Sequence, residues 1–172
     1  MEERRGFIHE KLDIKLLILF VLRRLPAEID AERLAELVLI DGGIGYFDYK
    51  ECLAELVETA QIEQREDGYV VTAKGSINGQ ILETTLPYSV RVKAERGTEP
   101  VAEEMRRSAM ILANHEPCEG GVTVYLSVSD GVGSIFDLKI LAADETQAKR
   151  IEKNFRKNAE AYYNRFIEAL SE

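Results

Sequence analysis

Apolar residues in the first 60 positions recur with the 3.6-residue period of an α-helix. A first helix is predicted to begin after Asp13, its N-cap, and to end before Pro26. A second is predicted over residues 30–40 and a third from Asp48, which has the spacing of an N-terminal cap pair with Glu51. A glycine-rich turn joins the last two, as in a helix-turn-helix unit. The residues expected to face the core are Ile14, Leu17, Ile18, Val21, Leu22, Leu34, Leu37, Val38, Cys52, Leu53, Leu56 and Val57.

A β-hairpin is predicted next, because two short extended runs, residues 61–66 and 69–72, flank Asp67-Gly68. An Asp-Gly pair favours a tight hairpin turn, in which both central residues need positive φ. Three helices followed by a hairpin predict a winged helix-turn-helix. Thr72 is then expected to cap a fourth helix that ends before Pro87. The apolar residues of that helix are Ile77, Ile81 and Leu82.

The second half of the chain predicts a small sheet. Residues 89–107 are expected to be helical in part, interrupted at Gly97 and Pro100. Residues 108–114 are a candidate strand, and residues 122–129 and 136–140 alternate apolar and polar side chains, as half-buried strands do. A helix from Glu145 to Leu170 would cover the apolar face of this sheet with one straight stripe about seven turns long. The stripe consists of Ala148, Ile151, Phe155, Ala159, Tyr162, Phe166 and Leu170.

Together these patterns predict an α+β fold, in which an N-terminal winged helix-turn-helix precedes a small antiparallel sheet packed by a long C-terminal helix. We expect residues 1–88 to form the first domain. Residues 89–172 would form the second, for dimerisation or sensing. The last helix is longer than a three-stranded sheet needs. Its candidate residues for a homodimer contact are Phe155, Tyr162, Phe166 and Leu170.

Composition favours a globular protein, since 45% of the 172 residues are hydrophobic and 31% are charged. The longest apolar run, residues 16–22, is far shorter than the stretch of about 20 residues that crosses a bilayer, so we expect no membrane association. Two cysteines make no disulfide framework, and the N-terminus lacks the features of a secretory signal. These observations predict a cytoplasmic protein.

Four segments carry a resemblance to a known family. KLDIKLLILFVLRRLP (11–26), YFDYKECLAELV (46–57), LPYSVRVKA (86–94) and KNFRKNAEAYYN (153–164) resemble parts of a bacterial family of uncharacterised winged-helix proteins, a domain of unknown function. More distantly, YVVTAKG (69–75) resembles the end of the wing and the start of the next helix in PadR-like and MarR-like regulators. The PadR-like resemblance implies a homodimeric transcriptional regulator that binds DNA.

Candidate DNA contacts follow from the way a winged helix docks, with the N-terminal end of its third helix at the base edges. They are Tyr46, Tyr49 and Lys50 on that helix, Arg65 at the wing tip, Lys74 after the wing and Lys15 on the first helix. Arg4, Arg5 and Lys11 could also follow the phosphates. Alternatively, Tyr46 and Tyr49 are packing residues and the charges are ordinary solvated ones.

Charge opposes this interpretation and keeps two alternatives open. The net charge is −9, and residues 1–90 carry 10 Lys and Arg against 17 Asp and Glu. Phosphate neutralisation supplies much of the affinity for DNA, so an acidic third helix works against binding. One alternative is a protein-interaction module that does not bind DNA; the other is a small-molecule sensor in the second half. A basic stripe on the last helix could serve DNA or an acidic partner: Lys149, Arg150, Lys153, Arg156 and Lys157.

The sequence does not indicate an enzyme. It contains no Ser/His/Asp or Cys/His arrangement, no phosphate loop and no HExxH motif. The segment His115–Glu119 holds three types of metal ligand, but no second cluster completes a coordination set. We therefore expect no metal, no cofactor and no catalytic residue.

Overall fold

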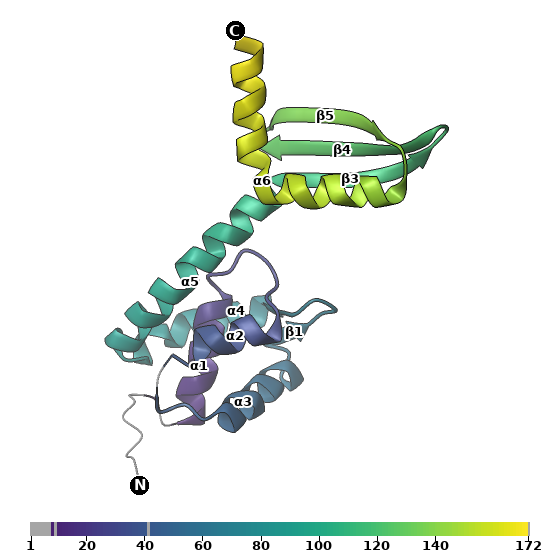
Figure 1. The fold of residues 1–172 in the computed structure, drawn as a ribbon. Helices are drawn as coiled ribbons and strands as arrows, with labels where there is room; N and C mark the ends of the chain where they lie inside the picture. The colour runs from purple at the N-terminus through teal and green to yellow at the C-terminus, as the bar shows by residue number, and fades with distance from the viewer. Residues whose placement is uncertain (1–7, 9, 41, 172) are drawn as a thin grey trace. The chain divides into compact units, whose positions relative to one another are not determined.

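The computed structural model describes residues 8, 10–40 and 42–171 (Figure 1). In this part of the chain the fold is mixed α and β, with six α-helices, one short 3-10 helix and two antiparallel sheets. The chain divides into two compact units, Met1–Met105 (unit 1) and Arg106–Glu172 (unit 2). Each unit has its own cluster of buried hydrophobic side chains.

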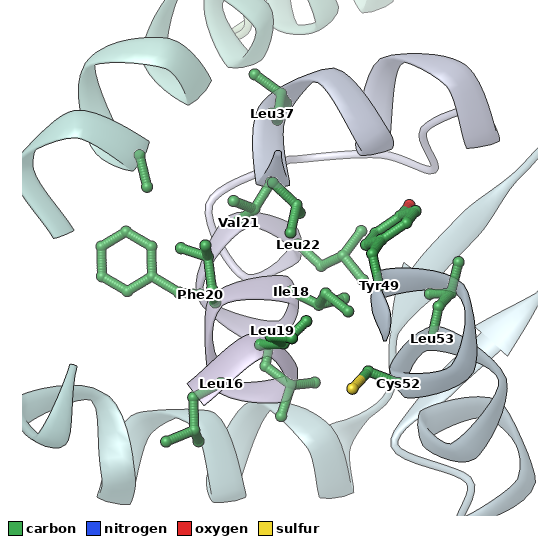
Figure 2. Close-up of a cluster of buried hydrophobic side chains, with 14 of the residues drawn as sticks. Leu16, Ile18, Leu19, Phe20, Val21, Leu22, Leu37, Tyr49, Cys52 and Leu53 are labelled. Atoms are coloured by element: carbon green, nitrogen blue, oxygen red, sulfur yellow. The ribbon is translucent and has the colours of Figure 1, made fainter. Parts of the chain in front are cut away.

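Helix α1 (Lys11–Leu22) is the centre of unit 1. All of its predicted inward residues are buried, and so are Leu16, Leu19 and Phe20, so the helix is covered on several sides rather than along one stripe. Figure 2 shows Phe20 pointing to one side of α1 while Ile18 faces Tyr49 and other residues of α3 (Tyr46–Glu58). The helix begins at Lys11 rather than after Asp13, which lies in its first turn.

The N-termini of α2 (Ala31–Val38) and α3 differ. The side chain of Asp30 accepts hydrogen bonds from the backbone N–H groups of Glu32 and Arg33, at 3.1 and 2.9 Å, and so caps α2. Helix α3 begins at Tyr46 with Gly45 as its N-cap and has no side-chain cap. The predicted cap pair starting at Asp48 is therefore wrong. Asp41, in the predicted turn between these helices, lies outside the described residues.

Strands β1 (Ile62–Gln64) and β2 (Tyr69–Val71) form the predicted hairpin, but its turn is not the predicted type. Residues 65–68 make a longer loop, closed by a 2.7 Å hydrogen bond from the N–H of Arg65 to the carbonyl of Gly68, and its residues do not have positive φ. A glycine is required for another reason. A Cβ at Gly68 would lie 2.1 Å from the carbonyl oxygen of Ile29, whose backbone bridges to Tyr69.

Helix α4 (Ala73–Leu82) is capped by Thr72 as predicted, since its Oγ1 accepts a 3.1 Å hydrogen bond from the N–H of Gly75. A short 3-10 helix, η1 (Glu83–Thr85), follows. The three large apolar residues of α4 are exposed: Ile77, Ile81 and Leu82. The buried positions are Gly75 and Gly79 instead, because the helix packs so closely that a Cβ at Gly75 would lie 2.0 Å from the carbonyl oxygen of Gln61.

Helix α5 (Tyr88–Ala109) is continuous through Gly97 and Pro100, which corrects the predicted interruption. Its apolar face accounts for this, because Val90 and Ala94 are buried in the core of unit 1 and Met105 packs against that core. This packing offsets the single backbone hydrogen bond that a proline removes. The boundary between the units accordingly lies after Met105, whereas the domain division predicted from sequence was at residue 88.

Unit 2 is a three-stranded antiparallel sheet in the order β3-β4-β5, with a helix along one face (Figure 1). The strands are β3 (Ile111–Cys118), β4 (Gly121–Ser129) and β5 (Ser134–Ala142). Because α5 continues to Ala109, β3 starts three residues later than predicted, and it includes His115–Cys118, which lie beyond the end of the predicted strand. Val124 and Leu126 are buried on the inner face, against α6 (Glu145–Ser171).

Helix α6 is kinked rather than straight. Asn158 has non-helical dihedral angles, φ −135° and ψ 25°, and the ribbon turns sharply there (Figure 1). The first limb, residues 145–157, and Ala159 just beyond the kink contribute buried side chains to the core of unit 2. The second limb, residues 159–171, ends with Leu170 82% exposed. The predicted apolar stripe therefore does not cover the sheet along its whole length.

Candidate nucleic-acid interface

The N-terminal end of α3 presents two aromatic rings and a cation. Tyr46 is 52% exposed and Phe47 is 86% exposed, and their ring centroids lie 6.2 Å apart in an edge-to-face arrangement. The Nζ of Lys50 lies 5.8 Å from the centroid of the Tyr46 ring, within the range of a cation–π contact. Gly45 directly precedes the helix, so the three side chains fall within its first five residues.

The candidate DNA contacts predicted from the sequence include Tyr46 and Lys50 but not Phe47. The helical period would have found it, because residues 47, 50 and 54 share one side of a helix whose buried side contains Tyr49, Leu53 and Leu56. An aromatic residue on the polar side of an amphipathic helix has no core to fill. Phe47 therefore contributes its ring to the surface of unit 1 and not to its core.

Tyr49 is removed from the candidate contacts. Its side chain is fully buried between α1 and α3 (Figure 2), so it cannot reach a ligand outside unit 1. Its hydroxyl has no hydrogen-bond partner among the described residues. Burial raises the pKa of this phenol well above its ordinary value, with smaller contributions from Tyr69 and Tyr46. Tyr49 is thus a core residue, which was the alternative left open by its sequence.

Two of the acidic residues on α3 are neutralised by α1. Lys11 pairs with Glu51, and Lys15 pairs with Glu55. The hydrogen bond to Glu51 raises the pKa of Lys11, and the hydrogen bond from Lys15 lowers the pKa of Glu55. The acidity of α3 is therefore partly masked, but Lys15, a candidate phosphate contact, already has a carboxylate partner.

Two further candidate cations that the structure describes, Arg65 and Lys74, also have partners within unit 1. Arg65 in the hairpin loop lies 3.1 Å from Glu63 and 4.0 Å from Glu28. Lys74 donates a 2.7 Å hydrogen bond to the carbonyl oxygen of Thr59. Arg4 and Arg5 lie outside the described residues.

A groove of about 390 Å³ lies between α3 and the hairpin. Its lining residues are Lys50, Leu53, Ala54, Val57, Glu58, Gln64 and Tyr69.

The candidate dimer residues on α6 divide at the kink. Phe155 is buried in the core of unit 2, stacked with Phe136, so it is corrected from a dimer contact to a core residue. Tyr162 is half-buried, whereas Phe166 and Leu170 on the second limb are exposed.

Two residues of the basic stripe on the first limb have partners within unit 2. Lys149 pairs with Glu145, and Arg156 donates a hydrogen bond to the carbonyl oxygen of Ala113.

The histidine that suggested metal ligation has another partner. Nδ1 of His115 lies 2.7 Å from Oε1 of Glu152, an ion pair or hydrogen bond between β3 and α6. Residues 8, 10–40 and 42–171 contain no group of three or more His, Cys, Asp or Glu side chains placed to hold a metal ion. Nor does any helix within these ranges combine the length and apolar character needed to span a bilayer.

Comparison with known families places the chain in one of them. A family model described as a domain of unknown function (DUF4364) matches residues 14–170, and the chain belongs to this family. Comparisons with curated proteins and with solved structures return no match.

Proposed function

We propose that unit 1 is a winged helix-turn-helix and that the protein is a homodimeric transcriptional regulator that binds DNA. The observation that carries the proposal is the exposed cluster of Tyr46, Phe47 and Lys50 at the start of α3, beside the groove that α3 forms with the hairpin. In a winged helix-turn-helix this end of the third helix enters the major groove. The proposal assigns no catalytic chemistry.

In this proposal the three side chains have distinct roles. Lys50 would contact a phosphate or a guanine, and the Tyr46 hydroxyl would donate to a phosphate. Phe47 would make an apolar contact, for which the methyl group of thymine is the natural target in the major groove. Because Lys11 and Lys15 are paired with carboxylates, we expect few phosphate contacts and a modest salt dependence.

Substitution of Lys50 tests the proposed interface. Fluorescence anisotropy would measure binding of labelled short duplexes, enriched from a random pool at low salt, to the wild-type protein and to Lys50→Gln. If Lys50 contacts a phosphate, its loss should reduce the slope of log affinity against log salt by about 0.9. Lys139→Gln, which removes a cation from an exposed position in β5, is the matched control and should leave the slope unchanged. A complete lack of salt-sensitive binding by the wild-type protein would remove the proposal.

Substitution of Glu55 distinguishes DNA from a protein partner. Glu55→Gln deletes one acidic group from α3 and releases Lys15 from its ion pair, so DNA binding should become tighter and more salt-dependent. A basic protein partner that docks on the acidic residues of α3 would instead bind the variant more weakly. Weaker DNA binding by Glu55→Gln would contradict the electrostatic argument.

A second candidate function, a protein-interaction module, is favoured by the 86% exposure of Phe47. Aromatic residues are enriched at the centres of protein–protein interfaces. A phenylalanine ring offers neither a charge nor a hydrogen-bond donor to a DNA phosphate. A photoreactive phenylalanine analogue at position 47 would decide between the two in cells. Cross-linking to DNA supports the regulator, whereas cross-linking to a protein in the absence of DNA supports the interaction module.

A further inference from the structure

Unit 2 contains an apolar pocket between the inner face of its sheet and the kink of α6. Its volume is about 220 Å³. The sheet contributes Leu126, Leu138 and Ile140, and residues from both limbs of α6 form the other wall of the pocket, which is open on one side to solvent. The helix residues are Ile151, Asn154, Phe155, Tyr162 and Phe166. All of them belong to unit 2, so the pocket is complete within one compact unit.

The kink at Asn158 is what places side chains of both limbs around this pocket. The break removes regular helical geometry at Asn158, and its side-chain amide donates a 3.2 Å hydrogen bond to the carbonyl oxygen of Asn154. The backbone change is thus supported locally. Phe155 before the kink and Tyr162 after it have nearly parallel rings, 12° apart in plane, with centroids separated by 6.2 Å.

The chemistry of the lining restricts what can bind. None of the eight lining residues is charged, and their polar groups are the amide of Asn154 and the hydroxyl of Tyr162. A charged group placed against the apolar wall would lose its hydration without gaining a partner, which is costly. Aromatic rings line the site and favour a flat partner that can make stacked or edge-to-face contacts.

We propose that this pocket binds a neutral, single-ring aromatic compound with one hydrogen-bonding substituent. The size of the pocket supports a single ring, because an apolar cavity of about 150 Å³ is enough for benzene and drug-sized ligands occupy about 300 Å³ or more. The substituent would bond to Asn154 or Tyr162. The inference does not depend on DNA binding, since the pocket lies wholly in unit 2, but it requires that the proposed homodimer leave Tyr162 and Phe166 uncovered.

A series of three single-ring probes tests the proposal. Para-cresol, toluene and para-toluate would be titrated into the full-length protein, with binding followed by amide NMR shifts and by tryptophan fluorescence of a Phe166→Trp variant. The natural chain has no Trp, so this variant reports on the rim of the pocket alone. Para-cresol should bind most tightly and toluene more weakly. Para-toluate should not bind at concentrations that saturate with para-cresol.

Two sets of variants locate the site. The double variant Asn154→Ala/Tyr162→Phe should weaken para-cresol about 3- to 10-fold, the contribution of one hydrogen bond, and leave toluene unchanged. Ile140→Phe fills the pocket and should abolish binding of both. Ile135→Phe, on the opposite face of the same strand, is its control and should bind normally.

The proposal is overturned if neither neutral probe shifts the amides of the pocket residues, or if para-toluate binds as tightly as para-cresol. It is also overturned if the pocket is covered by a second copy of the chain. In that case probe binding would appear only on dilution to monomer, as measured by light scattering, and Phe166→Asp would produce a monomer. Failure of DNA binding in the anisotropy assay leaves each of these readouts unaffected.

Discussion

Tyr49 illustrates how one buried hydroxyl changes the interpretation of a site. Its ring fills the space between α1 and α3, while its O–H has no partner among the described residues. An unsatisfied buried polar group costs about 1–3 kcal/mol. We therefore expect Tyr49→Phe to leave DNA binding unchanged and to raise the free energy of unfolding at neutral pH by about 1 kcal/mol.

The same hydroxyl predicts a pH dependence. Burial raises the pKa of folded Tyr49 above the unfolded value of about 10, so the unfolded chain loses this proton first as the pH rises. This proton therefore leaves the free energy of unfolding of the wild type constant below about pH 10 and lowers it progressively above about pH 10. The stability advantage of Tyr49→Phe over wild type should grow by about 1.4 kcal/mol per pH unit in that range. Urea denaturation at several alkaline pH values measures it, and a constant difference would show that the phenol ionises freely in the folded protein.

At the scale of elements, Thr72 joins the hairpin to α4. Its Oγ1 accepts from the N–H of Gly75 at 3.1 Å and lies 2.8 Å from the carbonyl oxygen of Ala60, to which it donates. Thr72→Ala removes both hydrogen bonds and should lower the free energy of unfolding by about 1–2 kcal/mol. Thr72→Ser keeps the hydroxyl and is the matched control. Equal losses in the two variants, measured by thermal denaturation, would assign the effect to the methyl group instead of the cap.

Helices α1, α3 and α4 show where element-level prediction from the sequence succeeds and fails. The cap of α4 at Thr72 was predictable because donor and acceptor lie three residues apart, whereas the caps predicted at Asp13 for α1 and at Asp48 for α3 are wrong. The direction in which α4 faces was not predictable from its apolar residues. The inward side of α4 is marked by Gly75, which allows the backbone at Gln61 to approach closely. Because glycine has no side chain, this contact does not show in the pattern of apolar residues along the sequence.

At the scale of the molecule, the two hydrophobic clusters share no residue among those described. Val124 is fully buried in unit 2, and Leu56 is buried in unit 1. Val124→Ala should cost about 2 kcal/mol, through lost apolar burial and a residual cavity. Hydrogen exchange should then show weaker amide protection in the sheet and α6, with unit 1 unchanged; Leu56→Ala should show the reverse. Loss of protection across both units in each variant would show that they unfold as one.

The sequence by itself determined the order and type of most elements, since helical and strand periodicity, local caps and the hairpin signal depend on residues close together in the chain. It also identified Tyr46 and Lys50 as candidate contacts. Only the tertiary structure decided that Tyr49 is enclosed and that α1 lysines pair with α3 carboxylates. It alone decided that α5 continues past Pro100 and that α6 bends at Asn158 around a pocket. These outcomes depend on packing between segments distant in sequence, whose burial energy outweighs local preference.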